Sequence, residues 1–226
     1  MRVNAWRLVI AAVVMMWAGT LYSQTARPPV RYLSQGWTQN DRSLFYTTTQ
    51  GSQLVPYSWY LALDQPGAST ARFNERSLAR YGFLENQDAS LNPDRLPLGF
   101  VKDGDTDWLG LTCAACHTNE IDSGGNTWRI DGGPALADTW AFLNDLGESI
   151  KQTAASSDGE KFRRFAMNLR GPALTPAQRT DLYTRLKTFS DGFTKFIDSS
   201  RTEVPWGHAR IDAFGMIFNR ATGINL

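Results

Sequence analysis

The sequence predicts a mainly α-helical protein with long loops and a small hairpin. Apolar residues recur at intervals of three and four through much of the C-terminal half, the pattern of helices that bury one face. The segment Thr-Pro-Ala-Gln at 175–178 has the composition of a helix start. A Gly-Gly-Asn turn at 124–126, flanked by Ile121, Trp128 and Ile130, predicts the hairpin.

The N-terminal half carries weaker signals. Residues 54–63 are dense in aromatic and aliphatic side chains, so we expect this segment to be buried, and Pro56 suits the first turn of a short helix. A second helix is expected from Ser69 to Tyr81, before the turns at 92–94 and 97–99.

The C-terminal half predicts three helices. The first has its apolar face formed by Leu136, Trp140, Leu143, Leu146 and Ile150. The second runs over residues 160–169 and is stopped by Gly171 and Pro172. The third begins behind Thr175 and has an apolar stripe formed by Leu182, Leu186, Phe189, Phe193 and Phe196. This stripe could line a cofactor pocket, but its spacing favours ordinary core packing.

Composition and the N-terminus indicate an exported globular protein. The chain is 42% hydrophobic with a formal net charge of +1 and no long run of either sign, so we expect no nucleic-acid partner. Arg2 and Arg7 precede the apolar run from Leu8 to Ala18, as in a secretory signal. We therefore expect a signal peptide over 1–26, one folded domain over 27–226, and a periplasmic or secreted location. If the signal is not cleaved, it would be the membrane anchor.

The chemistry of the chain is concentrated in one motif. Its two cysteines both lie in the segment Cys113-Ala-Ala-Cys116-His117. In a haem attachment motif, each thiol adds across a haem vinyl group and the adjacent imidazole binds the iron. The sequence therefore predicts one covalently attached haem c, with Cys113 and Cys116 as attachment sites and His117 as an axial ligand of the metal.

Three other interpretations compete with haem. The thiols could form a redox pair or a structural disulfide, although a redox pair is expected at a helix start in a βαβ unit and the surroundings look helical. Zinc could use Cys113, Cys116, His117 and His208, but the long separation of His208 from the others is poor zinc spacing. The motif could also be a coincidence.

The sixth iron position decides what such a haem does, because Met, a second His and an open site favour different chemistry. His208 and Met216 are the downstream candidates, and the site could also be open. A Met among apolar neighbours, as Met216 is, more often fills a core.

Three segments together resemble a known family: Gly110–Asn119, Arg129–Ala135, and Ala209–Gly215 with Asn219. They are similar to the N-terminal half of exported di-haem cytochromes c of the cytochrome c peroxidase superfamily, in the rubber-oxygenase-like branch, over residues 35–222. The resemblance implies a cytochrome c-type helical haem domain and oxidoreductase chemistry. It assigns Cys113 and Cys116 to the thioethers and His117 to the iron, and it assigns no catalytic residue.

The chain departs from this family in having one haem motif where the family has two. We therefore expect a chain that ends before a second haem domain and that by itself is an incomplete catalyst. As a haem oxidoreductase module, it would exchange electrons with a redox partner protein or a small donor, and a complete family member would act as a peroxidase or oxygenase. The alternative is a stand-alone electron-transfer cytochrome c without its own substrate, and an exported binding protein stabilised by zinc or a disulfide ranks third.

The export signal makes a testable prediction. Deleting residues 1–26 should leave the protein in the cytoplasm without haem, because attachment of haem c is completed after translocation. Cell fractionation followed by haem staining measures both effects. Haem-loaded protein in the cytoplasm of a strain without periplasmic maturation would contradict the prediction.

Overall fold

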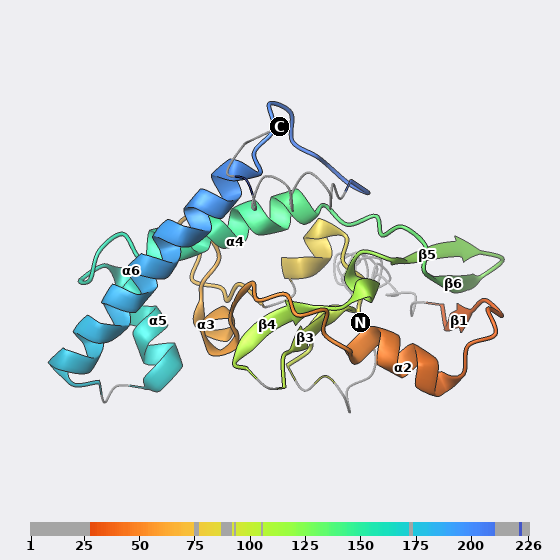
Figure 1. Ribbon diagram of the computed structural model, residues 1–226, viewed down its shortest axis with the longest axis horizontal. Coiled ribbons are helices and arrows are strands. Elements are labelled where there is room, and N and C mark those ends of the chain that lie inside the picture. Colours follow the sequence, from red (N-terminus) through yellow and green to blue (C-terminus); the bar gives the residue numbers. More distant parts are fainter. Residues whose placement is uncertain are drawn as a thin grey trace, which may run out of the picture.

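The computed structural model describes residues 28–74, 77–86, 92, 94–104, 106–171, 174–210 and 222 (Figure 1). The expected signal peptide at 1–26, Met216 and Asn219 lie outside these residues. Within the described ranges, no helix is both long enough and apolar enough to cross a membrane.

Among the described residues, six strands form two three-stranded sheets at the centre and right of Figure 1. Their bounds are β1 Val30–Tyr32, β2 Val55–Pro56, β3 Phe100–Lys102, β4 Trp108–Leu111, β5 Thr118–Ser123 and β6 Asn126–Asp131. In one sheet, β6 pairs in parallel with β1 and antiparallel with β5. In the other, β4 pairs antiparallel with β2 and β3. Because β4 and β5 belong to different sheets, the segment between them connects the two sheets.

The described residues also form helices, which are joined by loops. They are α2 Gln39–Thr47, α3 Tyr57–Ala62, α4 Thr139–Thr153, α5 Glu160–Arg170 and α6 Pro176–Ser199, with 3-10 helices η1 Ser77–Tyr81 and η2 Cys113–Ala115. Helices α4, α5 and α6 pack together on the left of Figure 1, and α3 contacts α5. Helix α2 contacts η2 and β3.

The C-terminal helices agree with the prediction. Thr175 and Gln178 form the expected capping box, with Pro176 in the first turn of α6. Helix α5 ends at Arg170, before Gly171 with its positive φ of 72°. The apolar stripe of α6 is core, as expected, because its residues are buried or packed against the core.

The prediction of a mainly α-helical, cytochrome c-type fold is wrong, because the described residues form a mixed α/β structure with two sheets. Most strands have two to four residues, too few for a periodic signal. Strand β6 is longer, but its buried positions are the polar residues Thr127, Arg129 and Asp131. Its apolar residues Trp128 and Ile130 are only half-buried, so the apolar side chains do not indicate which face of the strand is buried. The expected hairpin is present, as β5 and β6.

Two predictions in the N-terminal half need correction. The expected helix from Ser69 to Tyr81 is reduced to η1, and Arg72 instead forms an isolated β-bridge with Asp64. Pro56 ends strand β2 and directly precedes α3, so it lies before the helix and not in its first turn. The expectation that residues 54–63 are buried is confirmed for most of the segment.

An aromatic cluster joins the helices to the sheets. The buried ring of Phe142 on α4 lies 5.4 Å from both Phe83 and Phe100 and 5.7 Å from Tyr81, all in edge-to-face contact. Such pairs each add about 0.5–1.5 kcal/mol beyond the burial of their area. Since Phe100 begins β3 and Tyr81 ends η1, this cluster fixes α4 relative to both elements.

A buried ionic network joins the N-terminal region to the hairpin. The carboxylate of Asp131, at the end of β6, accepts hydrogen bonds from Arg42 Nε at 2.9 Å and Tyr46 Oη at 2.6 Å. Burial and the bond to Asp131 raise the pKa of Tyr46, which keeps it a protonated donor. Across the hairpin, Arg129 pairs with Glu120 at 2.6 Å, and both side chains are buried. The network therefore holds α2 against β6.

Asp131→Asn should lower the free energy of unfolding by about 3 kcal/mol, because it leaves the buried Arg42 guanidinium without its anionic partner. Urea denaturation measures the loss. Asp191→Asn is the matched control, since Asp191 pairs with Lys187 on an exposed helix face and should change stability little. Equal, small losses in the two variants would contradict the prediction.

Candidate functional site

The Cys-x-x-Cys-His motif forms one helical turn between β4 and β5. The buried Thr112 caps this turn, its Oγ1 accepting a hydrogen bond from Ala114 N at 3.2 Å. The carbonyl of Cys113 accepts from the backbone N–H of Cys116 at 3.3 Å and of His117 at 2.9 Å. The three predicted site residues therefore come together on a single turn.

The reactive side chains of the turn differ in their exposure to solvent. Residues three apart in a 3-10 turn lie one above the other, so the two cysteines share a side. Cys113 and His117 are exposed, Cys116 is half-buried, and the two thiols are not bonded to each other. No hydrogen bond joins the His117 ring to another residue of the described ranges. Two thiols and an imidazole are thus available to one ligand.

The backbone of the turn packs directly on Gly99. A Cβ atom at this position would lie 2.1 Å from Ala115 N and 2.5 Å from Ala115 Cα, and φ is +82°, a conformation that favours glycine. The Gly99 carbonyl also accepts from Thr112 N at 2.8 Å. The sequence predicts a turn at 97–99, but it does not identify Gly99 as a site residue.

A loop from Gly132 to Ala137 holds the other side of the turn. Gly132 N donates to the His117 carbonyl at 2.7 Å, and Ala135 N donates to the Cys116 carbonyl at 2.9 Å. Because Gly132 follows Asp131, the buried ionic network fixes the start of this loop. The motif is therefore anchored by backbone contacts on both sides.

Leu136 differs from its prediction. It was expected on the apolar face of the first C-terminal helix, but α4 begins at Thr139 and Leu136 lies in the loop, 53% exposed. The other four residues of that face, from Trp140 to Ile150, are buried. The exposed Leu136 directly follows Ala135, whose backbone N–H donates to the Cys116 carbonyl.

The geometry bears on two of the competing interpretations of the motif. Among the described residues, no group of three or more His, Cys, Asp or Glu could hold a metal ion, so the zinc set with His208 is not assembled. The motif does follow a strand, as a redox pair would. Burial and the nearby Cys113 raise the pKa of Cys116, which disfavours the thiolate of this residue.

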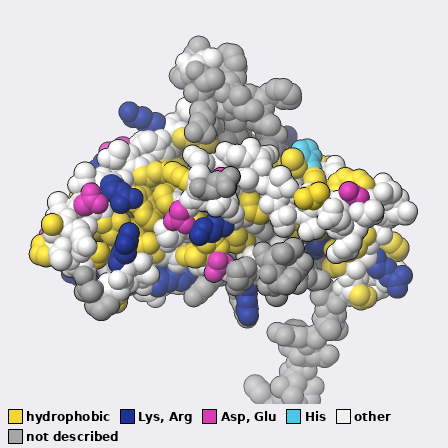
Figure 2. Space-filling view, turned by 60° about the horizontal axis from the view of Figure 1, so that its bottom comes forward, with side chains coloured by type: hydrophobic (Ala, Val, Ile, Leu, Met, Phe, Trp, Pro, Cys, Tyr) yellow, Lys and Arg dark blue, Asp and Glu magenta, His cyan; other side chains and the backbone are white. Residues whose placement is uncertain are grey.

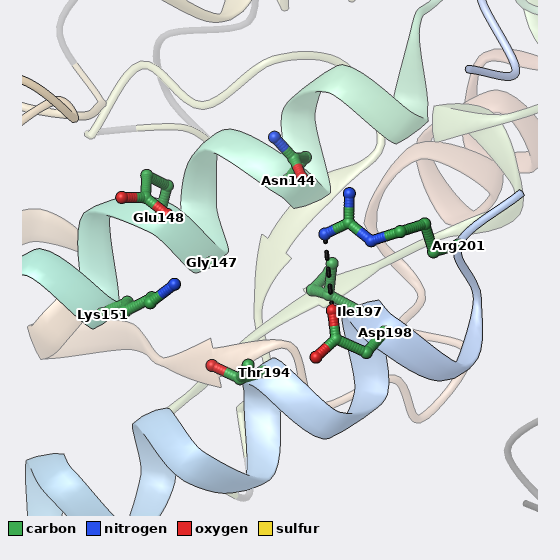
Figure 3. A pocket seen from close by; sticks show the side chains of 8 residues that line it. All are labelled: Asn144, Gly147, Glu148, Lys151, Thr194, Ile197, Asp198 and Arg201. Atoms are coloured by element: carbon green, nitrogen blue, oxygen red, sulfur yellow. Dashed lines mark hydrogen bonds and ion pairs between the residues drawn. The ribbon is translucent and has the colours of Figure 1, made fainter. Parts of the chain in front are cut away.

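A groove lies between α4 and α6, away from the motif residues (Figure 3). Its volume is about 90 Å³, and its rim carries both charge signs, including the exposed pair Arg201–Asp198. A Cβ at Gly147 would lie 3.3 Å from Phe193 and Ile197, so glycine lets the two helices approach. We interpret the groove as a consequence of helix packing.

Comparison with known proteins identifies a relative of unknown activity. No protein-family model matches the chain, and no solved structure matches it. The chain is 28% identical over 242 residues to "Uncharacterized protein y4iJ" of Sinorhizobium fredii. The match covers 95% of this chain and 39% of y4iJ, so the chain spans about two fifths of the length of this relative.

Gly99→Ala should destabilise the protein by at least about 2 kcal/mol, because the added methyl group meets the backbone of Ala115 and the positive φ is strained. It should also speed the reaction of both thiols with a thiol reagent. Gly192→Ala is the control: nothing lies within 4 Å of its Cβ position in α6, so it should gain about 0.5–1 kcal/mol. A Gly99→Ala protein with unchanged stability would refute the close contact.

Proposed function

We propose that this chain is a c-type haem module of an exported oxidoreductase. Cys113 and Cys116 would form the two thioether bonds, and His117 would bind the iron. Bound haem would supply one-electron chemistry. The observation that carries the proposal is that both thiols and a free imidazole lie on one exposed, anchored turn.

The side chains of the turn are not used by the fold itself. Leu136, an exposed apolar residue, follows Ala135, whose backbone N–H donates to the Cys116 carbonyl. The backbone contacts of Gly99 and Ala135 hold the turn without using the side chains of the motif. The thiols and the imidazole therefore remain free for the cofactor while their backbone stays fixed.

The residues of the chain would position the haem rather than react with a substrate. Thr112, Gly99 and the loop from Gly132 to Ala137 fix where the attachment points lie. Asp131 fixes the loop in turn through Arg42. Rigid support of this kind keeps a redox centre in one environment, which sets its potential.

This proposal depends on the motif and not on a helical cytochrome fold. Kinship with the di-haem cytochromes of the cytochrome c peroxidase superfamily remains a proposal that rests on the three sequence segments. A redox partner protein or a small donor would exchange electrons with the haem. On the face drawn in Figure 2, basic and acidic side chains are interspersed among apolar ones, so partner docking there would depend on short-range contacts.

Cys113→Ser combined with Cys116→Ser should abolish covalent haem, because the thioether bonds need both sulfur atoms. The proteins are made with a periplasmic maturation system, and mass spectrometry of the peptide that contains residues 113–117 measures attachment. His117→Ala should weaken iron ligation more than attachment.

Ala155→Ser is the control for these variants, since it places a serine at an exposed position in the turn after α4. It should keep one haem per chain. A wild-type peptide that carries no haem mass would overturn the proposed function.

A further inference from the structure

The imidazole of His208 is held against the loop that anchors the motif. Its Nδ1 lies 2.9 Å from the carbonyl oxygen of Leu136, and the next backbone N–H, that of Ala209, donates to Ala137 at 3.2 Å. These two contacts join residues that are about 70 positions apart in the sequence. The ring is therefore fixed in place although it is exposed.

Packing around the ring supports this placement. Gly82 has a φ of +79°, and a Cβ there would lie 3.1 Å from the Leu136 oxygen and 3.6 Å from His208 Nδ1. Glycine at this position leaves the room that the hydrogen bond occupies. Just before the histidine, the ring of Trp206 lies 5.1 Å from that of Trp140 on α4.

The hydrogen bond determines which nitrogen of the ring is free. A carbonyl oxygen only accepts, so Nδ1 must carry the proton, and the neutral ring then has its lone pair on Nε2. Histidines that bind metals commonly donate their other ring N–H to a backbone carbonyl in this way, which fixes the tautomer and the orientation. The bond to Leu136 therefore prepares Nε2 of His208 to bind a metal.

The same loop connects this imidazole to that of His117. Gly132 bonds to the His117 carbonyl, and Leu136, four residues later, bonds to the His208 ring. Even fully extended, four residues span no more than about 14 Å. The exposed side chain of Leu136 belongs to this span. The loop thus limits how far the His208 ring can lie from the backbone of His117.

We propose that His208 is the second axial ligand of the haem iron and binds it through Nε2. This inference rests on the proposed function, since it needs the haem attached at Cys113 and Cys116. With two imidazoles the iron is six-coordinate, which suits electron transfer and leaves no free position for peroxide or dioxygen. It would also explain why His208 is held on the loop that fixes the motif.

The test compares haem-loaded variants by absorption and electron paramagnetic resonance spectra. His208→Asn keeps a side-chain N–H for the Leu136 carbonyl but removes Nε2. It should keep covalent haem, convert ferric iron from low-spin to high-spin, and let the ferrous form bind carbon monoxide. His208→Ala should behave in the same way, and added imidazole should restore its low-spin spectrum.

Two control variants show whether the sixth ligand is His208 or a neighbouring residue. Arg210→Ala changes an exposed residue of the same segment and should keep the low-spin spectrum. Met216→Ala should also keep it, and conversion to high-spin in that variant would overturn the inference in favour of Met216. A low-spin His208→Asn protein, or a high-spin wild type, would overturn it while the proposed function stands. A wild type without covalent haem would overturn both.

Discussion

The arrangement around the Cys-x-x-Cys-His turn depends on one buried carboxylate, that of Asp131. Its bonds to Arg42 and Tyr46 join α2 to the end of β6, and the following residue, Gly132, holds the His117 carbonyl. A buried carboxylate is stable only when its charge is compensated and its oxygens are hydrogen-bonded. Asp131 therefore requires α2 to be in place, and this requirement couples the N-terminal region to the motif.

The site uses two kinds of contact for two purposes. Backbone contacts with Gly99, Gly132 and Ala135 fix the turn, while the side chains of the motif make no hydrogen bonds among the described residues. Such a division suits a covalently attached cofactor, because the ligand can take all three side chains without removing any hydrogen bond from the fold. In the proposed haem module, the loop from Gly132 to Ala137 would serve both axial imidazoles.

Predictions from the sequence were correct where a local signal was strong. The capping box at Thr175, the stop at Gly171 and the Gly-Gly-Asn hairpin all appear in the structure. Predictions were wrong where the buried residues are polar or the strands are short. Strand β6 buries Arg129 and Asp131, so the hydrophobic pattern did not indicate a sheet. The prediction for Leu136 was wrong for another reason. Its spacing from Trp140 matches a helix by accident, because the helix begins only after Asp138.

The sequence by itself determined the chemical content of the site, because Cys113, Cys116 and His117 are adjacent and one turn suffices to bring them together. Only the tertiary structure placed Gly99 beneath that turn and joined His208 to Leu136. Both contacts link residues distant in the chain, through backbone atoms that every residue has. Because any residue type can make a backbone contact, the sequence does not predict these contacts, and only the folded structure shows them.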